Sequence, residues 1–117
     1  MSIKFYKPTS AGQRGMSRVN YRAALSGAKR AKFLTGGGKR SVGRNAFGRI
    51  TVRHKGGGHK RVWRDVDFQM NKKNVPARIA TIEYDPNRSG FIGLAIYKDG
   101  ERRYVVVPQK MSVGTFF

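Results

Sequence analysis

The chain has 117 residues and a formal net charge of +19, which indicates one domain with a modest core and a polyanionic partner. Nucleic acid and an anionic membrane surface are the two partner classes that fit this charge. No apolar run approaches the ~20 residues of a membrane span, and the absence of cysteine excludes disulfides, thiolate metal sites and thiol nucleophiles.

The charge is divided unevenly along the chain. Residues 1–64 carry 17 Lys and Arg and no acid, whereas residues 65–117 carry 8 basic and 6 acidic residues. A segment with this much self-repulsion cannot stay compact without counter-charge, while the second half has the polarity of an ordinary folded domain. We therefore divide the chain into a basic N-terminal extension, residues 1–47, and a folded domain, residues 48–117.

The extension contains little that could form a core of its own. Helical spacing of apolar residues over 21–28 predicts at most a short helix, because Gly27 interrupts it. The glycine-rich stretch 35–41 resembles a phosphate-binding loop, but Phe33 stands where the Walker spacing needs glycine and Arg40 where it needs Ser or Thr. An acid-free, Arg- and Ser-containing start is also typical of organelle transit peptides, although the basic run is too long for a removable leader. We expect residues 1–46 to be disordered in the free protein and extended when bound.

Strand signals recur at short intervals from residue 48 onward. β-branched and aromatic residues alternate with polar ones, and the runs are separated by Asn-, Asp-, Gly- and Pro-rich turns. The run 91–97 is nearly all apolar, which predicts a central, buried strand. Five short strands with tight turns predict an all-β fold: a small five-stranded OB-like barrel with a long basic, mostly extended N-terminal arm. The expected strands are Ile50–His54, Arg61–Phe68, Ala77–Tyr84, Phe91–Tyr97 and Arg102–Val107.

The candidate binding site centres on a glycine turn flanked by cations, residues 55–60. Glycine lets the backbone approach a surface closely, and cations on both sides neutralise phosphates. A mobile hairpin tip with solvated charge is the alternative for such a loop. His54 and His59 flank the turn without any nearby acid, which favours contact with phosphate or a base over metal binding. The expected RNA-binding residues are Arg49, Arg53, His54, Lys55, Gly56, Gly57, Gly58, His59, Lys60, Arg61 and Arg64, followed by Arg40, Arg44 and Arg88.

Other residues with chemical potential have simpler explanations. Asp65 and Asp67 share one strand face, and we expect both to pair with nearby arginines rather than to act as paired catalytic carboxylates. Trp63, Tyr84 and Tyr97 are candidates for stacking on bases, although packing in the core is the commoner fate of strand aromatics. The sequence offers no nucleophile with a base and no acid–base pair, so we expect neither an enzyme nor a cofactor or metal.

Seven motifs follow one another along the chain: Lys7-Pro8-Thr9-Ser10, Gly43-Arg44-Asn45, Gly48-Arg49-Ile50-Thr51-Val52-Arg53-His54, Gly56-Gly57-Gly58-His59-Lys60, Val66-Asp67-Phe68, Glu83-Tyr84-Asp85-Pro86-Asn87-Arg88-Ser89 and Tyr97-Lys98-Asp99-Gly100-Glu101-Arg102-Arg103-Tyr104. In this order they closely resemble the N-terminal half of a known family, the universal large-subunit ribosomal protein L2. The resemblance implies an OB-like barrel with a basic extension that binds large-subunit ribosomal RNA, by phosphate and 2′-OH contacts more than by base sequence. The family adds a second small barrel and a C-terminal tail, to which no residue here corresponds.

These observations predict a structural constituent of the large ribosomal subunit. The alternatives are a free-standing OB-type binder of single-stranded nucleic acid and a membrane-surface peptide, the latter lacking an amphipathic helix. The half-length chain predicts a split protein whose second half is a separate chain among neighbouring ribosomal proteins. A split form favours the mitochondrial matrix, with chloroplast or bacterial cytoplasm as alternatives and a fragment as the other explanation of the length. We expect Phe116 and Phe117 to seat on a neighbour rather than on the chain's own barrel.

Overall fold

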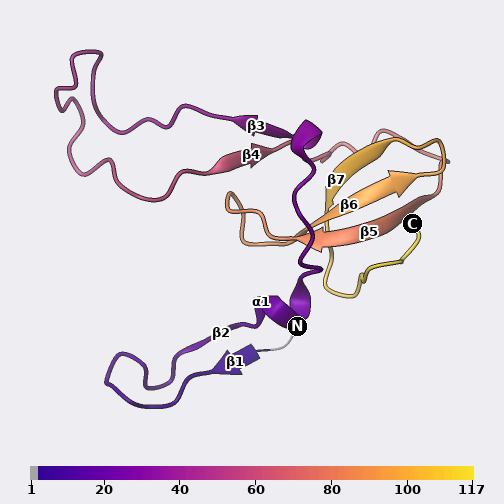
Figure 1. Cartoon of the computed structure of the whole chain (residues 1–117), viewed down its shortest axis with the longest axis horizontal. Coiled ribbons are helices and arrows are strands. Elements are labelled where there is room, and N and C mark those ends of the chain that lie inside the picture. The colour runs from indigo at the N-terminus through magenta and orange to yellow at the C-terminus, as the bar shows by residue number, and fades with distance from the viewer. Residues whose placement is uncertain (1–2) are drawn as a thin grey trace.

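The computed structural model describes residues 3–117 as an elongated molecule in which two arms leave one small sheet (Figure 1). The radius of gyration is 18.6 Å and the extents are 51 × 46 × 22 Å, whereas a compact domain of this length has a radius of about 13 Å. The chain is mostly strand, and its one α-helix has four residues. The expected all-β, extended character is confirmed.

The core is a three-stranded antiparallel sheet of β5 (Ala77–Glu83), β6 (Ile92–Tyr97) and β7 (Arg102–Val106), with β6 in the centre. A register shift between Ile79 and Thr81 makes a bulge in β5. The buried apolar side chains come from these strands and from Phe91 just before β6; they alternate in parts of β5 and β6 and are consecutive at the start of β6 and in β7. They are Ala77, Ile79, Ile82, Phe91, Ile92, Ala95, Tyr97, Tyr104 and Val105. These three strands and the central position of β6 confirm the sequence prediction.

Single bridges extend both edges of the sheet without closing it. On the β5 side, Ala77 and Phe117 exchange two backbone hydrogen bonds of 3.0 Å each, and Arg78 pairs with Phe116. On the β7 side, Val66 forms a parallel bridge with Tyr104. No sheet within residues 3–117 closes into a barrel, so the strand-rich character of the expected OB-like barrel is present but its five-stranded closure is not.

The missing closure has a local cause at two of the expected strands. Residues 50–54 form no strand: Ile50 makes one isolated bridge to Arg44 and remains 66% exposed, because no sheet lies beside it to pack against. The second expected strand shortens to β4 (Val62–Arg64), which pairs with β3 (Thr35–Gly37) rather than with the core sheet. The glycine-rich stretch before residue 38 is thus a strand, which sequence propensity does not predict.

The N-terminal segment has more structure than an extended chain. β1 (Ile3–Phe5) and β2 (Ser17–Val19) form an antiparallel hairpin, followed by the short helix α1 (Tyr21–Ala24) and a 3₁₀ turn, η1 (Lys32–Leu34). The Tyr21 ring meets the rings of Tyr84 and Phe91 edge-on, with centroids 5.5 and 5.9 Å away. The helix expected over 21–28 is shorter because Leu25 is already extended and Gly27 has φ +68°.

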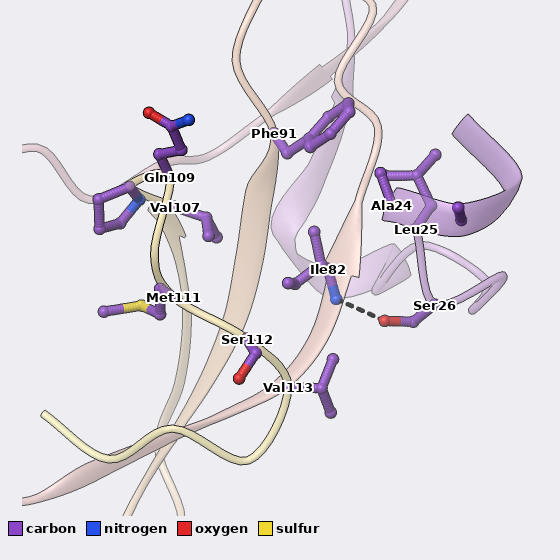
Figure 2. Close-up of a pocket in the computed structure, with 12 residues that line it drawn as sticks. Ala24, Leu25, Ser26, Ile82, Phe91, Val107, Gln109, Met111, Ser112 and Val113 are labelled. Carbon is purple, nitrogen blue, oxygen red and sulfur yellow. Dashed lines mark hydrogen bonds between the residues drawn. The ribbon is translucent and has the colours of Figure 1, made fainter. Parts of the chain in front are cut away.

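A cleft of about 500 Å³ separates α1 from the loop that follows β7 (Figure 2). Ser26 lines this cleft and forms two hydrogen bonds with the edge of β5. Its Oγ accepts from the Ile82 N–H at 2.8 Å, and its N–H donates to the Ile82 carbonyl at 3.0 Å. These bonds fasten the N-terminal segment to the core sheet beside the bulge of β5.

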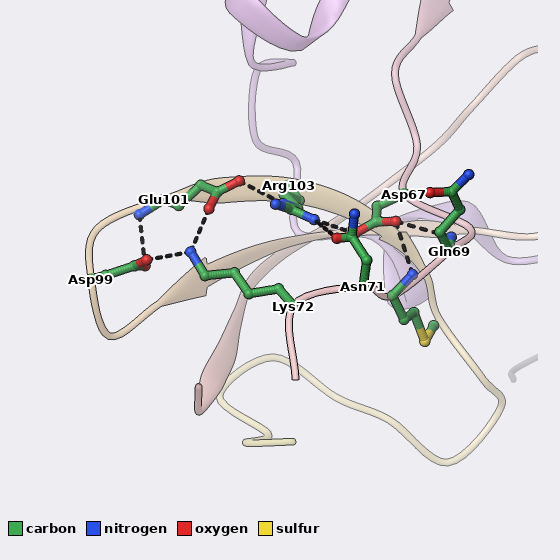
Figure 3. A network of polar contacts seen from close by, with 8 residues as sticks. Asp67, Gln69, Asn71, Lys72, Asp99, Glu101 and Arg103 are labelled. Carbon is green, nitrogen blue, oxygen red and sulfur yellow. Dashed lines mark hydrogen bonds and ion pairs between the residues drawn. The ribbon is translucent and has the colours of Figure 1, made fainter. Parts of the chain in front are cut away.

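An ion-pair network joins the connection before β5 to the β6–β7 hairpin (Figure 3). The Arg103 guanidinium contacts Glu101 at 2.5 Å and Asp67 at 2.8 Å, and the Lys72 ammonium lies between Asp99 and Glu101. Arg103 lowers the pKa of Asp67 and, together with Lys72, that of Glu101. The expected arginine partner is confirmed for Asp67, whereas Asp65 forms no ion pair within residues 3–117.

We predict that this network makes the stability of the sheet depend on pH. A carboxyl group whose folded-state pKa is lowered stabilises the fold above its unfolded pKa, and this stabilisation disappears as pH falls through the folded value. A variant carrying Asp67→Asn and Glu101→Gln should therefore melt below wild type at pH 6, and the difference should shrink progressively as pH falls below about 4. Melting temperatures by circular dichroism across this range measure it, and a difference that does not change with pH would contradict the prediction.

Candidate nucleic-acid interface

The candidate interface is a long basic loop held by the β3–β4 pair. Residues 38–61, here the long arm, leave the sheet at Gly38 and return at Arg61, projecting away from the core (Figure 1). The arm contains no acid, and all its cations are exposed to solvent. They are Lys39, Arg40, Arg44, Arg49, Arg53, Lys55, Lys60 and Arg61.

The tip of the long arm is a closed turn that depends on one glycine. The Gly43 carbonyl accepts hydrogen bonds from the N–H groups of Thr51 (2.8 Å) and Val52 (3.2 Å). Gly43 is buried with φ +67°, and a Cβ there would lie 2.5 Å from the Val52 carbonyl oxygen. The Arg44 guanidinium donates to the Gly48 carbonyl at 2.9 Å. Only glycine fits position 43, so this one residue determines the backbone conformation of the tip.

The glycines of residues 56–58 lie on the returning limb of the long arm, not at a hairpin turn. Arg40 on the outgoing limb donates to the His59 carbonyl at 3.3 Å. A Cβ on Gly58 would lie 3.0 Å from the Arg40 guanidinium, and Gly58 has φ +75°. The glycine turn expected between two strands over residues 55–60 is therefore wrong, and the group that comes close to Gly58 is the Arg40 side chain of the arm itself.

The two histidines are exposed on the same limb. The His59 Nδ1 lies 2.9 Å from the Lys60 carbonyl, and His54 adopts φ 58°. No group of three or more potential metal ligands occurs within residues 3–117. Both imidazoles are open to contact with a phosphate or a base.

Two of the expected cations lie at the root of the arm instead of on its surface. The Arg88 Nε contacts the buried Asp85 carboxylate at 2.5 Å. The Arg64 side chain, 11% exposed, lies 4.0 Å from the same carboxylate and donates to the Val62 carbonyl at 2.7 Å. Its Nε is buried without a partner within the described residues. Arg64, at the end of β4, joins the base of the arm to the sheet through Asp85, whereas the Arg88–Asp85 pair lies within the turn between β5 and β6. Every other expected residue, from Arg40 to Arg61, lies on the arm.

A second cationic element lies outside the sequence prediction. The β1–β2 hairpin extends to the same side of the sheet as the long arm in Figure 1. Lys4 and Arg18 each lie 5.7 Å from the centroid of the Tyr6 ring. The Pro8-to-Gly15 turn, with φ +76° at Gly15, is the sequence signal that could have indicated this hairpin.

The three aromatic residues expected as candidates for stacking on bases lie in different environments. Tyr97 is buried at 5% exposure and belongs to the core, and Tyr84 packs edge-on against Tyr21. Trp63 is 59% exposed at the root of the arm, and Phe47 at the arm tip is 90% exposed. The sequence prediction did not include Phe47, although its place between Arg44 and Arg49 marks it as an aromatic side chain within a basic loop.

Comparison with protein families decides the identity of the chain. The family model described as "Ribosomal Proteins L2, RNA binding N-terminal domain" matches residues 31–117. The chain belongs to the ribosomal protein L2 family. The L2 match covers the long arm and the core sheet, and it begins after the β1–β2 hairpin and α1. The chain is accordingly an rRNA-binding protein of the large ribosomal subunit, in a structural and non-enzymatic family.

The L2 family domain is OB-like, although the sheet observed here stays open. No helix among the described residues is long and apolar enough to cross a bilayer.

We predict that Gly43→Ala opens the tip of the long arm. A left-handed backbone costs about 1–2 kcal/mol for a residue with a Cβ, before the clash with Val52 is counted. Amide exchange at Thr51 and Val52 should then accelerate by about 5- to 30-fold. Gly37→Ala is the matched control, because position 37 has ordinary φ and open space around a Cβ. Equal protection in both variants would show that Gly43 does not hold the tip.

Proposed function

We propose that this chain is a structural constituent of the large subunit that stabilises folded rRNA and so supports translation. The observation that carries the proposal is a long arm without acids, whose root is joined to the folded sheet by the contacts of Arg64 with Asp85 and of Asn87 with the Val62 carbonyl. Cations fixed on a preorganised loop neutralise phosphates at a lower entropic cost than cations on a free tail.

The expected RNA-binding residues divide into two roles in this proposal. The arm residues contact RNA directly, with the cations on phosphates and the glycine backbone of 56–58 passing close to the ribose-phosphate chain. Arg64 acts by positioning the arm, because its guanidinium group faces the Asp85 carboxylate, and Arg88 pairs with the same carboxylate within the turn between β5 and β6. Recognition then depends on the shape of the folded RNA more than on its base sequence.

The free-standing single-strand binder is the less supported function. It needs several aromatics exposed on one face of a barrel. In the core sheet, Tyr97 and Tyr104 are buried at 5% and 0% exposure, so they offer no stacking surface there. Trp63 and Phe47 lie on the arm and its root instead.

Two finer expectations remain predictions. A separate polypeptide carrying the second half of the protein should accompany this chain in the same particle, and the particle should be mitochondrial. Mass spectrometry of purified large subunits from fractionated cells tests both, and it also distinguishes the chloroplast and bacterial alternatives.

We predict that phosphate contacts made by the arm dominate RNA affinity. With ~6–10 phosphates engaged, affinity for a large-subunit rRNA fragment should fall about 10³–10⁵-fold between 50 and 200 mM salt. A triple variant, Arg49→Gln, Arg53→Gln and Lys55→Gln, should reduce the slope of log affinity against log salt by about 2–3. Fluorescence anisotropy at several salt concentrations gives the slope.

The control is a triple variant with the same change of net charge on the core sheet. Arg78→Gln, Lys98→Gln and Arg102→Gln remove three exposed cations away from the arm. This control should change the slope little. Equal effects of the two triple variants would mean that net charge, rather than the arm, determines binding.

A further inference from the structure

A cleft of about 610 Å³ lies at the root of the long arm, where its two limbs enter the β3–β4 pair. Its walls come from three segments far apart in the sequence, and its volume falls in the range of roughly 300–1,000 Å³ typical of small-molecule sites. The lining residues are Gly38, Lys39, Arg40, Gly58, Lys60, Arg61, Trp63 and Asn87.

The aromatic wall of this cleft is Trp63, whose indole is 59% exposed. Trp63 lies directly opposite Gly36 in the β3–β4 register. Residues directly opposite on neighbouring strands project to the same face of a sheet, so a side chain at position 36 would stand beside the indole. Gly36 supplies none, and a Cβ there would have nothing within 4 Å. The face of the sheet next to the indole is therefore open to a planar group.

The remaining walls suit a nucleotide. The four charged side chains that line the cleft are all cationic, and no acid is among the lining residues. The Asn87 amide nitrogen is already committed, donating to the Val62 carbonyl at 2.9 Å and to the Asp85 carboxylate at 3.1 Å. This fixes the orientation of the amide and leaves its oxygen as an acceptor for the N–H groups of a base.

We propose that the cleft takes one unpaired nucleotide of the rRNA, with its base stacked on Trp63 and its phosphates held by Lys39, Arg40, Lys60 and Arg61. The inference rests on the proposed rRNA-binding function and adds a site to it. An aromatic face with cations on either side matches the two surfaces of a nucleotide, a flat base and a charged backbone. A base inside a duplex is already stacked on both sides, so only an extruded or single-stranded base can enter.

Trp63 is the single tryptophan of the chain, so its fluorescence reports this site alone. The probes are a mixed-sequence single-stranded RNA nonamer and a blunt duplex of the same length. The single strand should quench the tryptophan emission strongly, and the duplex should bind the cations with little quenching. Trp63→Ala should weaken binding of the nonamer about 5- to 150-fold, and Trp63→Phe should retain most of the affinity.

Gly36→Leu fills the space beside the indole while Trp63 and every cation of the cleft stay unchanged in sequence, and it should abolish the quenching. Gly37→Leu is the matched control, because position 37 faces the other side of the same strand and also has open space. This control should quench as wild type does.

Equal quenching by duplex and single strand, or undiminished quenching in Gly36→Leu, would overturn the nucleotide site while leaving the rRNA-binding function intact. A protein that binds neither RNA with a salt-dependent affinity would instead contradict the proposed function.

Discussion

The arrangement of the molecule depends on two buried carboxylates at the end of β5. Asp85 is 0% exposed and Glu83 is 6% exposed, and an uncompensated buried charge costs several kcal/mol. Their partners therefore have to stay in place. Asp85 faces Arg64 at the end of β4, and Glu83 accepts from the Tyr104 hydroxyl, whose oxygen accepts from the Ala31 N–H, each at 2.8 Å. Burial, helped by the Glu83 carboxylate, raises the pKa of Tyr104 to about 12. Ala31 lies just before η1, which leads into β3, and Arg64 ends β4, so both contacts hold the end of the β3–β4 pair from which the long arm extends away. The polar core of the sheet thereby also fixes the arm.

This anchoring explains how one short chain combines a folded sheet with a highly charged arm. All 6 acidic residues lie beyond residue 64, in or around the core sheet, where most of them pair with cations. The arm keeps its cations unneutralised, so it repels itself, and in the function proposed above RNA phosphates supply the counter-charge. Preorganisation at the root limits the entropy lost on binding. The exposed Trp63 and Phe47 sit on this same element, so the arm offers stacking surfaces together with charge.

The sequence predicts the core sheet well, because alternating apolar residues and Asp-, Asn- and Gly-rich turns determine β5, β6 and β7 locally. The prediction of strands from the sequence is wrong where tertiary contacts override the intrinsic strand propensity of the residues. Ile50 and Val52 have strong strand propensity but find no sheet to join, whereas Gly36 and Gly37 have little and still pair with β4. The expected barrel included residues 50–54 as one of its five strands, and these residues form no strand in the structure. The cations of the arm follow from composition, but the inward position of Arg64 requires knowing where Asp85 is buried.

The central claim, that Asp85 fixes the RNA-binding arm, is tested most directly by comparing Asp85→Asn with Asp99→Asn. Both variants remove one negative charge, which by electrostatics alone strengthens binding to a polyanion. Asp99 lies on the β6–β7 turn with its side chain half exposed, away from the arm's root. We expect Asp85→Asn to speed amide exchange across β3 and β4 and to weaken affinity for a large-subunit rRNA fragment, while Asp99→Asn leaves both unchanged or binds slightly tighter. Unchanged exchange and equal or tighter RNA binding in Asp85→Asn would contradict the account.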